Sequence, residues 1–302
     1  MRGVSRSIQK QVIELAWPAV IQGLLTTIVL FTDRLILGTF NDDALGAMQI
    51  CGPVLWCSFQ VFASFGVGVV AVVGRAYGAK DVLRVQRTLG TAIGLAIAAG
   101  VALGVLGYLG RDMIAALITG DTNTPQSITA MATVYMGIVF LAAPLQLLGT
   151  TATVSLQALG DTRTPMIVAG LSGLTNLALT WIFVFGHFGA PELGMQGAAI
   201  GTAASFAINA FLLNWRLLRG PLGYGVGRPS ISGGKHIFRV TRPALLERLV
   251  FHSAYITFAA FIGHLGGAAM KAHQALMAIE SLGFIGAHAF GIAAGALVAQ
   301  KL

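Results

Sequence analysis

The sequence predicts an all-α polytopic membrane protein that forms a two-lobe helical bundle, and three observations support this fold class. Hydrophobic residues make up 56% of the 302 residues and charged residues only 10%, whereas soluble domains carry about 25% charged residues. Apolar stretches of roughly 20 residues or more recur along the chain, each long enough to cross a hydrocarbon layer about 30 Å thick. The third observation is an internal repeat, which indicates two related halves.

Eight membrane-spanning helices are predicted from these stretches. The first is about two dozen residues long, which exceeds the apolar core of a cleaved signal peptide. Proline lies within four of the spans, at Pro18, Pro53, Pro144 and Pro243, where a missing backbone hydrogen bond permits bending. The spans run over about residues 12–38, 45–74, 88–110, 130–156, 165–187, 197–218, 243–264 and 272–299.

Lysine and arginine fall mainly in the segments on one side of these spans, around residues 2–10, 75–87 and 216–242. By the positive-inside rule this side is cytoplasmic. The sequence therefore predicts a multi-pass protein of the plasma (inner) membrane, in contact with membrane lipids, with a cytoplasmic N-terminus. The excess of basic residues, 19 against 11 acidic ones, sits in short loops beside the spans and does not indicate binding to nucleic acid.

The longest polar stretch separates two parts of the chain. It reads RLLRGPLGYGVGRPSISGGKHIFRVTRP over residues 216–243, and its Gly, Pro, Ser and Arg content is typical of a linker. We therefore expect an N-terminal lobe of six helices in residues 1–220, a cytoplasmic linker in 221–242, and two helices of a second lobe in 243–302.

The repeat relates these two parts. Placing Pro18 over Pro243 aligns residues 18–77 with residues 243–302 without a gap, and it also matches glycines of the outer turns. An even number of predicted spans precedes the linker, so both halves begin with the same orientation. The repeat is therefore parallel, with an axis along the membrane normal.

Several motifs resemble multidrug and toxic compound extrusion (MATE) transporters. The segment LAWPAVIQGLLTTIVLFTDRLILGTFNDDALGAMQ, residues 15–49, is similar to the first helix of that family. Three further segments are similar to family signatures in helix two, in the loop between helices four and five, and in the turn into helix six. They are GVGVVAVVGRAYGAKD (66–81), SLQALGDTRTP (155–165) and GHFGAPELGMQGAAIGTAAS (186–205). The resemblance covers nearly the whole chain, in matching order and spacing.

The resemblance implies twelve helices in two six-helix lobes around a central cleft. It also implies export of amphipathic or cationic small molecules in exchange for inward H⁺ or Na⁺. No cofactor is expected besides this coupling ion, and a monomer is expected. Since only two helices of the second lobe are present, we expect the sequence to be incomplete at its C-terminal end, and a 302-residue form not to transport.

Asp33 is the strongest candidate for a functional residue, because it interrupts the apolar run LLTTIVLFTDRLILGTF, residues 24–40. A charged side chain deep in a bilayer costs roughly 2.5–3.5 kcal/mol on insertion scales, so such residues are rare and usually functional. A low-dielectric bundle favours the neutral form of a carboxyl group, which could then bind and release a proton. Asp33 matches the family's first-helix acid, which implies cation coupling. The alternative is a paired or hydrated residue near the outer helix end.

Asn176 is the second coupling candidate, since it matches a family position in helix five. The family often has an acid four residues later, where this sequence has Thr180. The absence of that acid favours a single-acid proton mechanism over a two-carboxylate Na⁺ site. Tyr135 and Thr202 match positions that surround the first-lobe acid, with ordinary interhelical hydrogen bonds as the alternative.

Four further residues are candidates for the substrate or cation cleft. Gln22, Gln49 and Gln274 are polar groups within spans, although glutamines there commonly form packing hydrogen bonds. Glu247 lies near a point where some family members carry an acid, and an interfacial pair with Arg248 is the alternative.

Two other classes of function remain open. A lipid-linked saccharide flippase of the same superfamily would need several basic residues in its spans to bind a pyrophosphate, and these spans hold few. An intramembrane enzyme such as a polyprenyl transferase would need acidic clusters to hold Mg²⁺, but the only acidic cluster, in residues 41–43, lies in a short outer turn. No catalytic residue is therefore expected. Cys51 and Cys57 lie on one predicted helix and indicate neither a disulfide framework nor a metal site.

Overall fold

The computed structural model describes residues 2–119, 126–219, 225–264 and 287–301, and within these ranges the regular structure is helical. A short 3₁₀ helix, η1, spans His187–Gly189, and residues 287–301 form a last helix without a label. The α-helices are α1 (Arg2–Phe40), α2 (Asp42–Ala63), α3 (Phe65–Gly78), α4 (Val82–Thr119), α5 (Gln126–Leu141), α6 (Ala143–Ala158), α7 (Arg163–Phe185), α8 (Met195–Leu218) and α9 (Ile231–His264).

The helices are long and apolar, which confirms the predicted all-α membrane fold. Among the described residues, five segments have the length and hydropathy to cross a membrane, and the bent pair α5–α6 makes a sixth. These correspond to the first six predicted spans. The seventh, 243–264, lies within α9, which is not among the segments that meet the hydropathy criterion. Most of the eighth, 272–299, lies outside the described residues.

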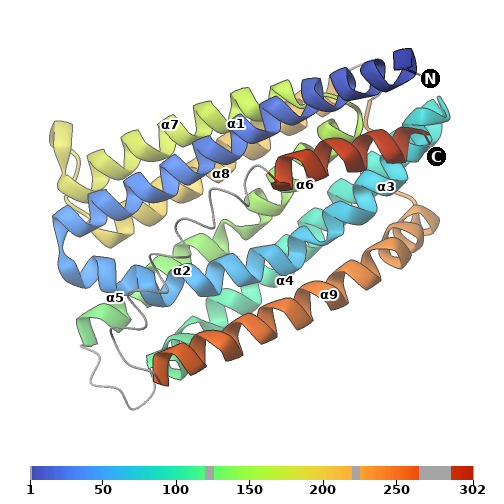
Figure 1. Ribbon diagram of the computed structural model, residues 1–302. Helices are drawn as coiled ribbons and strands as arrows, with labels where there is room; N and C mark the ends of the chain where they lie inside the picture. The colour runs from blue at the N-terminus through green and yellow to red at the C-terminus, as the bar shows by residue number, and fades with distance from the viewer. Residues whose placement is uncertain (1, 120–125, 220–224, 265–286, 302) are drawn as a thin grey trace.

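The helices pack side by side along one common direction (Figure 1). Helix α7 packs between α1 and α8, and α4 packs against α5 and α6. Helix α9 follows α3 and α4 on the opposite side of the bundle from α7 (Figure 1). Both ends of the chain lie at the same end of the bundle.

Two predicted spans are interrupted. Helices α5 and α6 meet at Ala142 with a bend of 54°, and Pro144 lies in the first turn of α6. Proline has no N–H to donate to the carbonyl four residues earlier, that of Phe140, and its ring clashes with a straight helix there. The second break, at Ser64 between α2 and α3, has no proline; the Ser64 hydroxyl donates a hydrogen bond to Val61 O (2.6 Å). The prolines of the other three spans, Pro18, Pro53 and Pro243, lie inside helices that continue past them.

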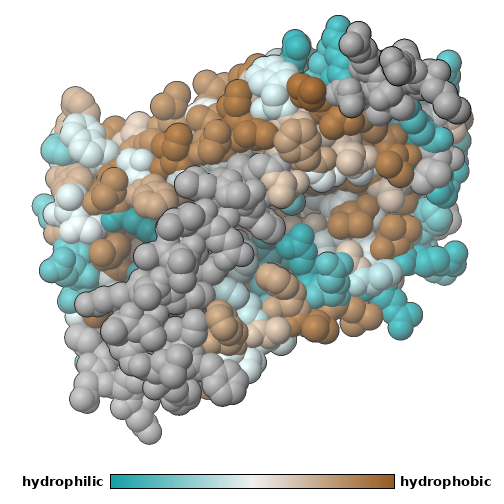
Figure 2. Space-filling model, viewed as in Figure 1, coloured by the Kyte–Doolittle hydropathy of each residue, from teal (hydrophilic) through white to brown (hydrophobic). Residues whose placement is uncertain are grey.

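Two buried apolar clusters hold the first six spans together. In lipid such contacts stabilise the fold through van der Waals packing rather than through removal from water. Side chains of one cluster include Leu37, Met136, Phe140 and Val184, and those of the other include Val73, Leu89, Leu156, Leu213 and Ile237. Large hydrophobic side chains also cover much of the outer surface, with hydrophilic residues gathered toward the two ends of the bundle (Figure 2).

The predicted linker is partly helical. Helix α9 begins at Ile231, inside the 221–242 segment, and runs on through Pro243. The residues before it are fastened to α4: Gly227 N–H donates to Gln86 O (2.9 Å), and Ser230 N–H donates to the Thr91 hydroxyl (2.9 Å). Gly and Ser in this stretch are typical of a linker, and these hydrogen bonds hold the described part of it against α4.

The arrangement of the helices agrees with a parallel repeat. Helices α1 and α9 run in the same direction, and the helix of residues 287–301 lies beside α3 (Figure 1). A Cβ built at Gly74 of α3 would lie 2.6 Å from Ala299 Cβ, and these two positions are counterparts in the repeat. Next to this contact, Gln300 Nε2 donates to Ala158 O (2.8 Å).

Candidate functional site

Asp33 is buried in the last third of α1, seven residues before the helix ends at Phe40. Its side chain is only 7% exposed, and it is the one carboxylic acid among the described residues that is so fully covered. The neighbouring Arg34 is exposed, as expected for adjacent residues on a helix, which point in different directions. The aspartate therefore faces the packed helices while the arginine points away from them.

Two polar residues of α7 face this carboxyl group. Asn176 and Thr180 lie one turn apart on the same face of α7, are 3% and 0% exposed, and both lie near the Asp33 carboxyl group. Among the described residues, no hydrogen bond of standard geometry reaches Asp33 Oδ1, Asn176 Oδ1 or Thr180 Oγ1. Leaving a buried polar atom without a hydrogen bond costs about 1–3 kcal/mol. This cost favours any state of the site that supplies a proton or a cation to these oxygens.

The cluster extends to α8 and α5. Asn176 Nδ2 donates to Thr202 Oγ1 (3.4 Å), and Tyr135 OH lies 3.2 Å from the same hydroxyl, where either group could be the donor. Tyr135 is 6% exposed. Asp33, Asn176, Thr180, Thr202 and Tyr135 thus form one buried group, which we call the Asp33 cluster.

Two glycines allow the helices around the cluster to approach one another. A Cβ built at Gly201 of α8 would lie 2.5 Å from Thr180 Oγ1 and 3.1 Å from Asn176 O. A Cβ at Gly173 of α7 would lie 2.8 Å from Val29 Cγ2 of α1. Small residues at such crossings are typical of membrane helix packing, and here they bring three helices to one buried acid.

The Asp33 cluster offers one ionisable carboxyl group surrounded by neutral donors and acceptors. When the carboxyl is ionised, the Asn176 amide and the Thr180 hydroxyl can donate to it. When it is protonated, it can donate to Asn176 Oδ1 or Thr180 Oγ1, which are both acceptors. The cluster can therefore hydrogen-bond both protonation states, which suits reversible binding of a proton.

The remaining candidates are not gathered around Asp33. The Gln22 side chain accepts a hydrogen bond from Gln157 Nε2 of α6 (3.3 Å), about 16 Å along α1 from Asp33 at 1.5 Å per residue. Gln49 and Glu247 are exposed, and Gln274 lies outside the described residues. Gln157, which is 3% exposed, was not singled out from the sequence, and nothing in its local pattern distinguishes it.

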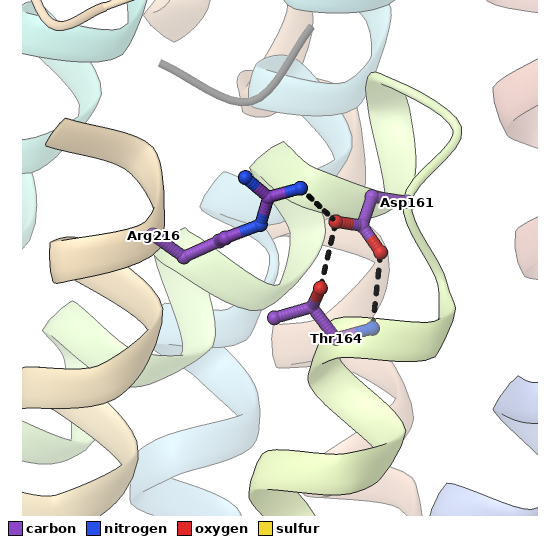
Figure 3. Close-up of polar contacts among 3 residues, drawn as sticks. All are labelled: Asp161, Thr164 and Arg216. Atoms are coloured by element: carbon purple, nitrogen blue, oxygen red, sulfur yellow. Dashed lines mark hydrogen bonds and ion pairs between the residues drawn. The ribbon is translucent and has the colours of Figure 1, made fainter. Parts of the chain in front are cut away.

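A second polar group lies at the connection between α6 and α7 and consists of Asp161, Thr164 and Arg216 (Figure 3). Asp161, between α6 and α7, accepts hydrogen bonds from the Thr164 N–H (3.0 Å) and the Thr164 hydroxyl (2.7 Å). Its Oδ2 also lies 3.5 Å from Arg216 Nη2 of α8. This group ties the α6–α7 connection to α8 and is separate from the Asp33 cluster. Among the described residues, no three His, Cys, Asp or Glu side chains are arranged to hold a metal ion.

Comparison with known proteins relates this architecture to transporters. The MatE family model matches residues 18–182. The chain is 30% identical over 296 residues to a probable multidrug resistance protein NorM of Thermotoga maritima, covering 97% of this chain and 63% of that protein. It is 28% identical over 268 residues to a probable multidrug resistance protein YoeA of Bacillus subtilis, covering 86% and 57%. A FAD transporter of Shewanella oneidensis is 26% identical over 277 residues, covering 89% and 60%. The chain thus spans less than two thirds of the length of these relatives.

Solved structures have the same fold. A MOP superfamily transporter from Pyrococcus furiosus superposes with a TM-score of 0.84 at 20% identity, covering 95% of this chain and 63% of that one. An outward-facing multidrug resistance MATE family transporter superposes with a TM-score of 0.85 at 19% identity, covering 97% and 65%.

Proposed function

The chain belongs to the MatE family, and from this premise we propose that it takes part in exporting amphipathic or cationic small molecules in exchange for an inward-moving cation. Relatives named as multidrug resistance proteins support this substrate class. They give less support to a saccharide flippase, and an enzymatic role has no support from them. The proposal places the basic end of the bundle, with the N-terminus, in the cytoplasm of a cell whose inner membrane the protein spans.

Asp33 is the proposed binding site for the coupling ion. The observation that carries this assignment is the burial of a carboxyl group among neutral groups that can hydrogen-bond it in either protonation state. H⁺ is the ion that the cluster favours, because the position one turn after Asn176 holds Thr180 rather than a second carboxylate. A Na⁺ site would draw on the oxygens of all three residues, with only one negative charge to balance the ion.

Coupling then follows from the two charge states of Asp33. Proton uptake removes a buried negative charge and so changes the relative free energies of the two orientations of the cleft. Binding of substrate to one orientation and of the proton to the other makes each promote the release of the other, since coupling between sites is reciprocal.

Replacing Asp33 by Asn tests this assignment. The amide keeps the shape and hydrogen bonding of the side chain but cannot titrate. We expect Asp33→Asn to lower proton-driven transport of a cationic dye more than tenfold in proteoliposomes of protein produced from the complete gene. Asp33→Glu should retain a measurable fraction, because it keeps a titratable group within about one carbon–carbon bond of the original position. Asp112→Asn, which removes a 75% exposed carboxylate, is the matched control and should transport at the wild-type rate.

Dye binding, measured by fluorescence anisotropy, separates coupling from recognition. We expect the Asp33→Asn protein to bind the dye without the proton release that accompanies binding to the wild-type protein. Wild-type transport rates in Asp33→Asn under a proton gradient alone would contradict the role of Asp33. Absence of transport by the wild-type protein for every cationic dye tested would instead contradict the transport proposal.

A further inference from the structure

Basic residues form a continuous surface at the start of α9 and the start of α4. Lys235, Arg239 and Arg242 recur at the i, i+4 and i+7 spacing that places side chains on one face of a helix, and all three are exposed. On α4, Arg84 and Arg87 are exposed as well. We call these five side chains the basic face.

Packing fixes the direction in which the α9 part of the basic face points. Ile237 and Thr241, on the other side of the same helical turns, are fully buried. They pack against Gly68 of α3, where an added Cβ would lie 2.7 Å from Ile237 O and would also overlap the Thr241 side chain. Because the buried side of α9 is held in this way, its three cations face outward.

The hydrogen bonds of the linker bring the α4 part beside it. Thr91 Oγ1 accepts from Ser230 N–H (2.9 Å), and a Cβ at Gly233 would lie 3.3 Å from the same oxygen. Arg87 lies one turn before Thr91, and Arg84 lies one turn before that, along the same side of α4. The cations of α4 and α9 therefore belong to one surface rather than to two.

Among the described residues, no carboxylate forms an ion pair with the cations of the basic face. The ion pairs found among the described residues involve other cations: Lys10, Arg111 and Arg216. Asp81, which directly precedes α4, uses its Oδ1 to accept a hydrogen bond from Arg84 N–H (3.0 Å) as a helix cap. Glu247 lies two turns beyond Arg239 along α9 and makes no ion pair with a described residue. The basic face thus carries five positive charges available to an external anion.

Two of the three α9 cations of the basic face lie at the depth of the phosphate layer of a bilayer. The predicted seventh span begins at Pro243, so Arg242, Arg239 and Lys235 lie about 2, 6 and 12 Å beyond it at 1.5 Å per residue, and only Lys235 extends past the headgroups. The headgroup region is about 5–8 Å thick on each side of the hydrocarbon core. Phe238 and Leu83, 51% and 64% exposed, add apolar side chains beside the cations, as expected for a surface at the boundary between headgroups and acyl chains.

We propose that the basic face binds the phosphate groups of anionic phospholipids in the adjacent leaflet. Arginine pairs with phosphate through two parallel hydrogen bonds, and clusters of Lys and Arg next to membrane helices attract anionic lipids. Phe238 and Leu83 distinguish this occupant from a free anion, because they contact acyl chains that inorganic phosphate lacks. The inference goes beyond the proposed transport function and does not depend on it.

Native mass spectrometry of the detergent-solubilised protein from the complete gene tests this inference. The protein is titrated with phosphatidylglycerol or with phosphatidylcholine of the same acyl chains. We expect wild type to bind phosphatidylglycerol more tightly and the Lys235→Gln/Arg239→Gln/Arg242→Gln protein to lose this preference. At roughly fivefold for each cation removed, the dissociation constant for phosphatidylglycerol should rise by about 100-fold, whereas that for phosphatidylcholine should hardly change.

A triple variant with the same loss of charge elsewhere is the control. Lys10→Gln/Arg163→Gln/Arg219→Gln changes cations of α1, α7 and α8, on the other side of the bundle, and should keep the wild-type preference. If the first triple variant does not fold, Lys235→Gln alone should weaken phosphatidylglycerol binding about fivefold, and Arg239→Lys/Arg242→Lys should retain most of it.

Three outcomes would overturn the proposal. One is wild-type lipid preference in the first triple variant or, where that variant does not fold, in Lys235→Gln. Another is an equal loss of preference in the control, which would mean that net charge alone is responsible. The third is displacement of bound phosphatidylglycerol by inorganic phosphate at equal concentration, which would mean that the surface binds a free anion.

Discussion

Asp161 uses its two carboxylate oxygens for two kinds of interaction. The hydrogen bond from the Thr164 N–H satisfies a donor in the first turn of α7 that has no partner within the helix. The ion pair with Arg216 involves a side chain that is 41% exposed, so solvent screening leaves it about 0–1 kcal/mol. Asp161 therefore contributes more to the stability of the fold through the helix cap than through the ion pair.

Substitutions at Asp161 separate these two contributions. Asp161→Ala removes both and should destabilise the protein by about 1–2 kcal/mol, the usual cost of losing a cap. Asp161→Asn keeps a good capping residue and should cost no more than Arg216→Gln, which serves as the control. Thermal unfolding in detergent measures all three. Equal losses for Asp161→Asn and Asp161→Ala would show that the charge pair dominates instead.

Single residues differ in how far the sequence could identify them. The burial of Asp33 was predictable, because a charge inside an apolar run is costly unless the side chain is packed inside the bundle. Asp161 and Arg216 lie in polar segments where charges are common, and only the packing of α8 against the α6–α7 connection brings them together. Gln49 and Glu247 were predicted to line the cleft, but both are exposed. A polar residue in a helix need not face the interior, and the helical period does not show which neighbouring helix each face contacts.

The bend between α5 and α6 packs closely against two glycines of α4. Pro144 leaves the Phe140 carbonyl without its usual helical donor, and Gly104 of α4 lies so close that an added Cβ would be 2.8 Å from this oxygen. A Cβ at Gly100 would be 2.5 Å from Pro144 Cα. The bent pair can thus pack closely against α4 only because glycine occupies these positions.

Two glycines of the same helix give opposite predictions. Gly104→Ala would push against backbone atoms, which cannot rotate away, and overpacking of this kind costs about 1–3 kcal/mol. Gly94→Ala has no atom within 4 Å of its Cβ, so the better helix propensity of alanine should leave stability unchanged or raise it by up to about 1 kcal/mol. Apparent melting temperatures in detergent compare the two. A Gly104→Ala protein as stable as Gly94→Ala would mean that α4 and the bend are not so tightly packed.

The sequence predicted where the first six spans lie but not how two of them are interrupted. Pro144 gave a reason for the α5–α6 bend, yet Pro18, Pro53 and Pro243 provide the same local signal without ending a helix. The break at Ser64 had no signal in the sequence, and the helical start of α9 was not predicted because Gly233 and Gly234 are typical of a linker. Contacts with α3 and α4, distant in sequence, decide both cases.

The contact between α3 and the helix of residues 287–301 joins two counterparts of the repeat, Gly74 and Ala299. In a parallel repeat with a two-fold axis, counterparts can touch only where the axis passes near them. Gln300, by donating to Ala158 O, adds a polar contact beside the axis. The two orientations of the cleft proposed above require this end of the bundle to separate during the transport cycle.

A cross-link across the axis tests this requirement. Gly74→Cys/Ala299→Cys, with Cys51 and Cys57 replaced by Ala, places two thiols close enough to oxidise after a small adjustment, since disulfides need Cβ atoms about 3.5–4.5 Å apart. Oxidation should stop dye transport by protein from the complete gene, and a reductant should restore it. Each single cysteine protein should be insensitive to the oxidant. Full transport by the cross-linked protein would contradict opening at this end.

The Asp33 cluster has a consequence for how such a protein could have arisen. Its members come from α1, α5, α7 and α8, which all precede the linker, so a gene encoding only the first repeat would already encode the entire cluster. Duplication of that gene would give two copies of the complete cluster. Substitutions in the second copy would then leave the first copy of the cluster intact. The present sequence agrees with such a difference between the copies, because the counterpart of Asp33 in the repeat is Phe258. The two halves match in sequence and run in the same direction, but only the first has an acid at this position.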